Sequence, residues 1–73
     1  MVLISYVKPY ILIQSNELIS GHMTILGKDQ KVLWEDDFSD KDFLSVKVHK
    51  NWKDGIKIIV ATKHHKIKKE LII

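Results

Sequence analysis

The amino-acid sequence predicts an all-β domain, built as a small sandwich or a strongly curled antiparallel sheet. Apolar and polar residues alternate along several short segments, as in Leu44–His49, which places every second side chain on a core face. Turn-forming residues separate these segments, and β-branched Ile and Val are frequent within them. No segment carries a sustained helical stripe of apolar residues, so a helical fold is excluded.

Short apolar segments follow one another along the chain, and their spacing is typical of a sandwich or barrel of six to seven strands. The expected strands are Val2–Val7, Tyr10–Gln14, Leu18–Leu26, Lys31–Glu35, Phe43–His49, Ile56–Thr62 and Ile67–Ile73. Pro9 either divides the first two or marks an edge strand. Polar residues Ser15–Glu17 separate the second strand from the third.

The remaining connections carry recognisable turn residues. Gly27 and the polar residues after it predict a tight hairpin, Asp54-Gly55 is a strong turn dipeptide, and Lys63–Lys66 forms a second hairpin loop. The least regular stretch is Asp36–Asp42, where a loop is expected. One helical turn capped by Ser39 is the alternative there.

The 73 residues are enough for one domain, residues 1–73, and the chain contains no cysteine that could form a disulfide or bind a metal. The apolar start, Met1–Ile13, is interrupted at Lys8-Pro9 and lacks the features of a signal peptide. It is also too short to span a membrane, so no membrane insertion is expected. The location stays open: cytoplasmic if the sequence is complete, secreted if it is the C-terminal module of a larger protein.

The charge pattern bears on nucleic-acid binding. The formal net charge is +3, and all twelve basic residues are lysine. Specific nucleic-acid readers rely on arginine for bidentate contacts, so lysines that solvate the surface and protect sheet edges are the simpler interpretation. The alternative is a small OB-like or SH3-like β-barrel that binds nucleic acid through a lysine-rich side with aromatic stacking platforms.

Binding residues can be suggested from the lysines and the large aromatic side chains. The candidates are Trp34, Trp52, Lys57, Lys66, Lys68 and Lys69. For the two tryptophans, packing in the core or at a strand edge is the alternative, since a small sandwich needs large side chains inside.

We find no arrangement of residues that indicates catalysis, and we expect no enzymatic activity and no cofactor. The serines lack the Gly-x-Ser-x-Gly elbow, and the three glycines form no phosphate-binding loop. Carboxylates that can supply calcium ligands are Asp36, Asp37, Asp40 and Asp42. The EF-hand spacing is absent and Lys41 interrupts the run, so a solvated loop without metal is expected. The four histidines lack zinc-ligand spacing.

Three segments carry a resemblance to a known family: Met23–Val32, Trp52–Val60 and Lys68–Ile73. They run strand–polar turn–strand, then glycine turn and strand, then a basic and apolar final strand. From Gly21 onward the chain thereby resembles the small immunoglobulin-like β-sandwich modules at the C-termini of Bacteroidetes secreted proteins, including type IX secretion sorting domains. The resemblance implies an immunoglobulin-like sandwich and a non-catalytic sorting or adhesion module that a partner recognises.

Taken together, these observations favour a non-catalytic protein-binding or structural module. It would act through an exposed edge strand or an aromatic patch, because an unpaired strand edge offers backbone groups to a partner. Val2–Val7 and Ile67–Ile73 are the candidate edges. Both are strongly apolar, so a homodimer through these terminal strands is also expected.

Overall fold

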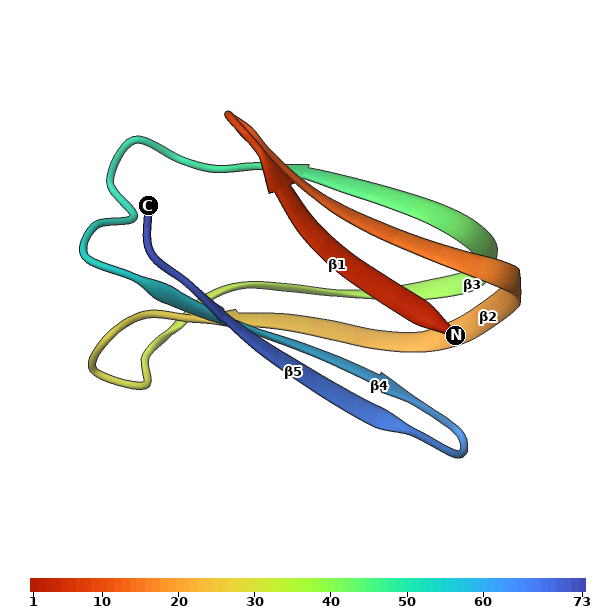
Figure 1. The fold of residues 1–73 in the computed structure, drawn as a ribbon. Coiled ribbons are helices and arrows are strands. Elements are labelled where there is room, and N and C mark those ends of the chain that lie inside the picture. The colour runs from red at the N-terminus through yellow and green to blue at the C-terminus, as the bar shows by residue number, and fades with distance from the viewer.

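The computed structural model describes all 73 residues as one curled antiparallel sheet without helices (Figure 1). Its strands are β1 (Val2–Val7), β2 (Tyr10–Leu26), β3 (Val32–Lys47), β4 (Ile56–Thr62) and β5 (Lys66–Leu71). Neighbouring strands follow the order β1-β2-β4-β5, and β3 pairs with β2. The prediction of an all-β fold is confirmed.

Five strands are present where six to seven were expected, because two pairs of predicted strands are continuous. β2 runs through Ser15–Glu17 and β3 runs through Asp36–Asp42. The loop expected at Asp36–Asp42 and the alternative helical turn at Ser39 are therefore both wrong. The two strands form one long hairpin that pairs on both sides of these polar stretches. A strand can continue through polar residues when their side chains face solvent and the neighbouring strand still pairs with its backbone groups.

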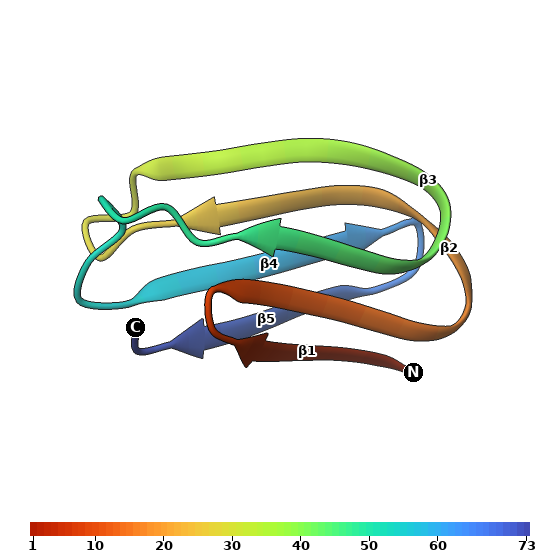
Figure 2. The ribbon, with the colours of Figure 1, turned by 90° about the horizontal axis from the view of Figure 1, so that it is seen from above.

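The long hairpin bends and thereby creates two layers (Figures 1 and 2). Register shifts between Gln14 and Gly21 add unpaired residues, and such bulges bend and twist a strand. The first layer contains β1, the first half of β2 and the last half of β3. The second layer contains the first half of β3, the last half of β2, β4 and β5.

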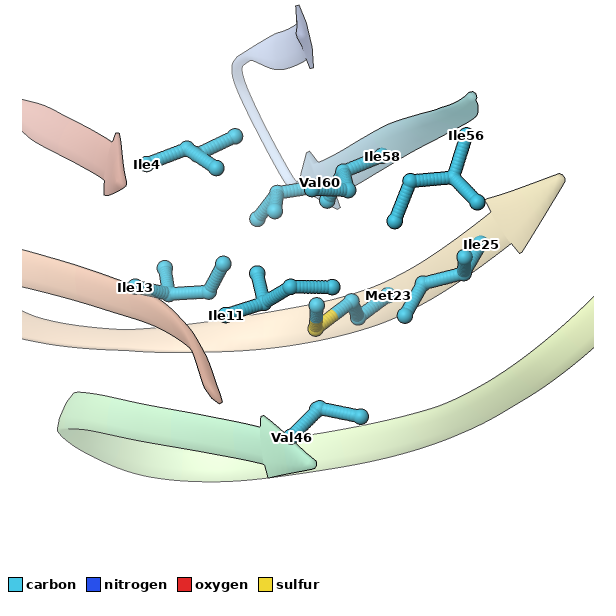
Figure 3. Close-up of a cluster of buried hydrophobic side chains, with 9 residues drawn as sticks. All are labelled: Ile4, Ile11, Ile13, Met23, Ile25, Val46, Ile56, Ile58 and Val60. Atoms are coloured by element: carbon cyan, nitrogen blue, oxygen red, sulfur yellow. The ribbon is translucent and has the colours of Figure 1, made fainter. Parts of the chain in front are cut away.

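The core lies between the two layers (Figure 3). Nine buried apolar side chains form it, and no polar side chain is buried. They are Ile4, Ile11, Ile13 and Val46 from the first layer and Met23, Ile25, Ile56, Ile58 and Val60 from the second. The alternation predicted for Ile56–Thr62 is confirmed, since Ile56, Ile58 and Val60 all point inward.

The turns form where the sequence predicted them. Lys8-Pro9 is a two-residue turn with a cis peptide bond between β1 and β2. The amide of Gly27 donates a 2.8 Å hydrogen bond to the carbonyl oxygen of Lys31, which closes the β2–β3 hairpin. Asp54 and Gly55 both have positive φ values, 70° and 138°. Gly55 adopts its value without strain because glycine has no Cβ atom.

Candidate functional site

The outward side of the first layer is an apolar surface built from three strands. Antiparallel pairing places Leu3 of β1, Gln14 of β2 and Phe43 of β3 in one row across the sheet. The next rows are Ser5, Leu12 and Ser45, and then Val7, Tyr10 and Lys47. Their neighbours along each strand, such as Ile4 and Ile11, point into the core. All nine side chains therefore share the outward side.

Large apolar side chains on this surface remain in contact with solvent. The exposed fraction is 58% for Leu3, 59% for Val7, 43% for Tyr10 and 50% for Phe43. Leu12 lies between them and is half-buried. Lys47 is the single charged residue among the nine. We call the surface formed by Leu3, Val7, Tyr10, Leu12 and Phe43 the apolar face.

The outward side of the second layer has a different character, with charges at its two ends. One row across the sheet contains Glu35, Thr24, Ile59 and Lys68, and the adjacent row contains Asp37, His22, Ala61 and Lys66. The carboxylates belong to β3, the lysines belong to β5, and the positions between them are uncharged or carry a histidine. We call these eight residues the charged face.

Local contacts hold the acidic end of the charged face in place. Asp37 Oδ1 accepts a hydrogen bond from His22 Nδ1 at 2.7 Å, and His22 Nε2 lies 3.9 Å from Glu35 Oε1. In the next row of the sheet, which adjoins the row of Glu35, Lys57 Nζ lies 3.9 Å from Glu70 Oε1. Lys57 and Glu70 thus balance each other, whereas Lys66 and Lys68 have no carboxylate within 4 Å.

The structure separates the six binding residues suggested by the sequence. Lys57, Lys66 and Lys68 point outward on the second layer. Lys69 lies opposite Ile58 and points inward. Trp34 lies opposite Ile25 on the inner side of β3, and Trp52 lies in the loop before β4; both pack against the core. The lysines that point outward therefore have neither tryptophan beside them.

The acidic residues suggested as metal ligands line β3. Asp36, Asp37, Asp40 and Asp42 are all exposed, and no three His, Asp or Glu side chains come together as a possible metal site. The side chain of Asp36 accepts a hydrogen bond from the amide of Asp37, and the amide of Asp40 donates one to Ser20 Oγ. β3 pairs only with β2, so these charges lie along an unpaired edge, where charge discourages pairing with other chains.

The two predicted edge strands face each other. β1 and β5 end the strand order β1-β2-β4-β5 and lie side by side where the two layers meet (Figure 2). No backbone ladder joins them, but Lys69 Nζ donates a 2.9 Å hydrogen bond to the carbonyl oxygen of Ile4. Each edge therefore partly shields the other.

Sequence reasoning missed the apolar face. In Val2–Val7 and Tyr10–Gln14 most residues are apolar at both odd and even positions, which is typical of a strand covered on both sides. That pattern was a usable signal, because a two-layer fold can cover only one side of each strand.

Comparisons with known proteins identify no family, so the function is inferred from the surfaces described above. No protein-family model matches the sequence, and no curated protein matches it either. The structure has no helix with the length and hydropathy needed to cross a bilayer.

Proposed function

We propose that this chain is a non-catalytic protein-binding module that contacts its partner through the apolar face. The observation that carries the proposal is the row arrangement of Leu3, Val7, Tyr10 and Phe43, which are all exposed on one side of one layer. Contiguous exposed apolar patches mark interaction sites, and aromatic residues are enriched in interfaces. We propose Tyr10 and Phe43 as the aromatic residues of the contact, in place of Trp34 and Trp52, which the sequence suggested.

The proposed fold type agrees with this function. Two antiparallel layers over one core are compatible with the immunoglobulin-like sandwich that the sequence resemblance implies. The modules that the sequence resembles are recognised by other proteins, so the resemblance supports a protein partner. A sorting or adhesion role belongs to the same proposal.

The energetics also favour a protein partner. Burying one large apolar side chain contributes roughly 1.5–3 kcal/mol, and four such side chains are half-exposed here. Sheet positions are rigid, so little conformational entropy is lost when they are covered. Lys47 and Lys8 lie at one end of the apolar face, where a polar rim is typical of interfaces.

A comparative binding experiment tests the proposal. The immobilised wild-type chain and the variant Leu3→Ser/Phe43→Ser are each exposed to a cell extract, and retained proteins are quantified by mass spectrometry. We expect a retained protein that the variant loses and that binds again when purified. The matched control Lys66→Ser/Lys68→Ser, which alters the other layer, should retain it. Equal retention by Leu3→Ser/Phe43→Ser would reject the apolar face as the binding surface.

A second candidate function is nucleic-acid binding, favoured by the outward lysines Lys57, Lys66 and Lys68 on β4 and β5. Against it, carboxylates lie on the same side of this layer, and both tryptophans are directed elsewhere. A titration of a fluorescent single-stranded oligonucleotide tests it. Each phosphate neutralised should lower log K by about 0.7 per log unit of salt. Absence of binding at low salt would reject this function.

A further inference from the structure

We infer that two copies of this chain pair through their charged faces, with β3 of each copy over β5 of the other. The observation behind the inference is the separation of charge across the second layer: Glu35 and Asp37 at one end, Lys66 and Lys68 at the other. A surface of this kind is complementary to itself when one copy is turned over. The partner is therefore a second copy of the same chain.

The charges select one orientation of the pair. Two-fold symmetry is the commonest symmetry of homodimers, and two sheets can face each other about an axis that runs either along or across the strands. An axis across the strands places β3 over β3 and β5 over β5, which opposes like charges. An axis along the strands places β3 over β5, which opposes carboxylates and lysines. Only the arrangement that places β3 over β5 is electrostatically favourable.

The rows of the sheet match in this orientation. Rotation about an axis along the strands keeps each row at its own height, so Glu35 comes to lie over Lys68 of the second copy. Asp37 lies over Lys66 of the second copy in the adjacent row. The next row is neutral within each copy, because Lys57 and Glu70 already lie 3.9 Å apart. Two-fold symmetry repeats both charge contacts, which gives four in all.

The centre of the charged face permits close approach. Thr24 and Ala61 are short, and Ile59 is half-buried and apolar. Packed sheets lie about 10 Å apart, a distance at which short side chains of the two copies meet. Because rim ion pairs fix orientation more than they add affinity, we expect a weak dimer that dissociates as salt is raised.

The inference is independent of the proposed binding function. The charged face and the apolar face lie on opposite layers of the molecule, so pairing through the first leaves the second free. A dimer of this form carries two apolar faces on its outer sides. It would engage a partner that displays two binding sites more tightly than a single chain would.

Charge-reversal variants test the inference. The first variant is Glu35→Lys/Asp37→Lys and the second is Lys66→Glu/Lys68→Glu. Each alone opposes like charges at all four contacts, whereas one copy of each restores opposite charges at all four. We measure self-association of the wild type, each variant and their equimolar mixture by sedimentation equilibrium at low salt. We expect each variant alone to weaken association at least about tenfold, and the mixture to recover it, since like-charge contacts oppose docking strongly.

Two results of the self-association measurements would overturn the inference, and a third would move the contact to another surface. A wild type that stays monomeric at millimolar concentration rejects it, as does a mixture that does not recover association. Loss of the dimer in Leu3→Ser/Phe43→Ser with no loss in the reversal variants places the contact on the apolar face or the terminal strands instead. Circular dichroism verifies folding, and Lys66→Gln/Lys68→Gln provides a milder variant if a reversal variant fails to fold. Dimerisation and binding of another protein are separate measurements, so each can fail alone.

Discussion

Lys69 and Ile4 are joined by a side-chain hydrogen bond across the place where the two layers meet, with 2.9 Å between Nζ and the carbonyl oxygen. The two residues belong to β5 and β1, which no backbone ladder connects. Lys69 is also the one candidate binding lysine that points inward, opposite Ile58. The side chain of Lys69 stays exposed, and its ammonium group satisfies the carbonyl oxygen of Ile4 at the edge of β1.

Replacing Lys69 by methionine should lower the free energy of unfolding by about 1 kcal/mol, since methionine keeps the apolar stem but loses the hydrogen bond. Urea denaturation at low protein concentration measures the change. Lys68→Met is the matched control, because Lys68 points outward and has no such bond; we expect a change within about 0.5 kcal/mol. Equal effects of the two substitutions would show that the bond contributes nothing.

Gly21 should not tolerate alanine. It lies in β2 between Phe38 of β3 and Thr62 of β4, and a Cβ atom there would collide with the carbonyl oxygen of Ala61. We expect Gly21→Ala to cost about 3 kcal/mol or to prevent folding, since the backbone of a central strand cannot move aside.

Gly27→Ala provides the control for Gly21→Ala. Its added Cβ would lie 3.4 Å from Leu33 Cδ1, an ordinary contact with a side chain that can adjust. Thermal unfolding should therefore show little change for Gly27→Ala. A variant at Gly21 as stable as the one at Gly27 would contradict the pairing of β2 between β3 and β4.

Neighbouring residues of β2 should lose different amounts of stability on truncation. Ile11 is fully buried in the core, whereas Leu12 belongs to the apolar face. Ile11→Ala should reduce stability by about 2–5 kcal/mol, because it leaves a cavity. Leu12→Ala should cost less than half of that. Denaturation curves of the two variants compare them directly, and a larger loss at Leu12 would mean that the sides of β2 are reversed.

The carboxylates of β3 should suppress aggregation more than they stabilise the fold. Asp36→Thr/Asp42→Thr removes two charges from an edge that has no strand partner, so we expect faster fibril formation with little change in unfolding free energy. Thioflavin fluorescence over time measures this. The control Glu17→Thr/Glu70→Thr removes two carboxylates from other strands. If both variants aggregate equally, the faster fibril formation results from the change in net charge and not from the edge of β3.

Local sequence was sufficient for some elements and insufficient for others. Val2–Val7 and Ile56–Thr62 were predicted with their observed bounds, because alternation and the flanking turns at Pro9 and Gly55 define them. The continuity of β2 and β3 was missed, since each strand passes its polar stretch only because the other accompanies it. That pairing joins residues far apart in sequence, which local patterns do not report.

The functional surfaces illustrate the same limit. Alternation identifies a core side but does not say what covers the other side, so Phe43 was not singled out. Trp34 and Trp52 were suggested for binding on size and type. Trp34 faces inward because strand pairing places it opposite Ile25, and Trp52 packs against the core from the loop before β4. The charged face depends on the neighbours of β2, which are β3 and β4, and these were not predictable from composition.

The bend shared by β2 and β3 also governs how the molecule loses its structure. Each of these strands contributes to both layers, so neither layer can melt while the other persists, and unfolding should be a single cooperative transition. A chain cut near Glu17 would separate β1 and the first half of β2 from the rest of the first layer, and would leave no fragment with a complete core. The β4–β5 turn at His64 interrupts only the second layer, which makes it the natural place to split this protein into two reassociating pieces.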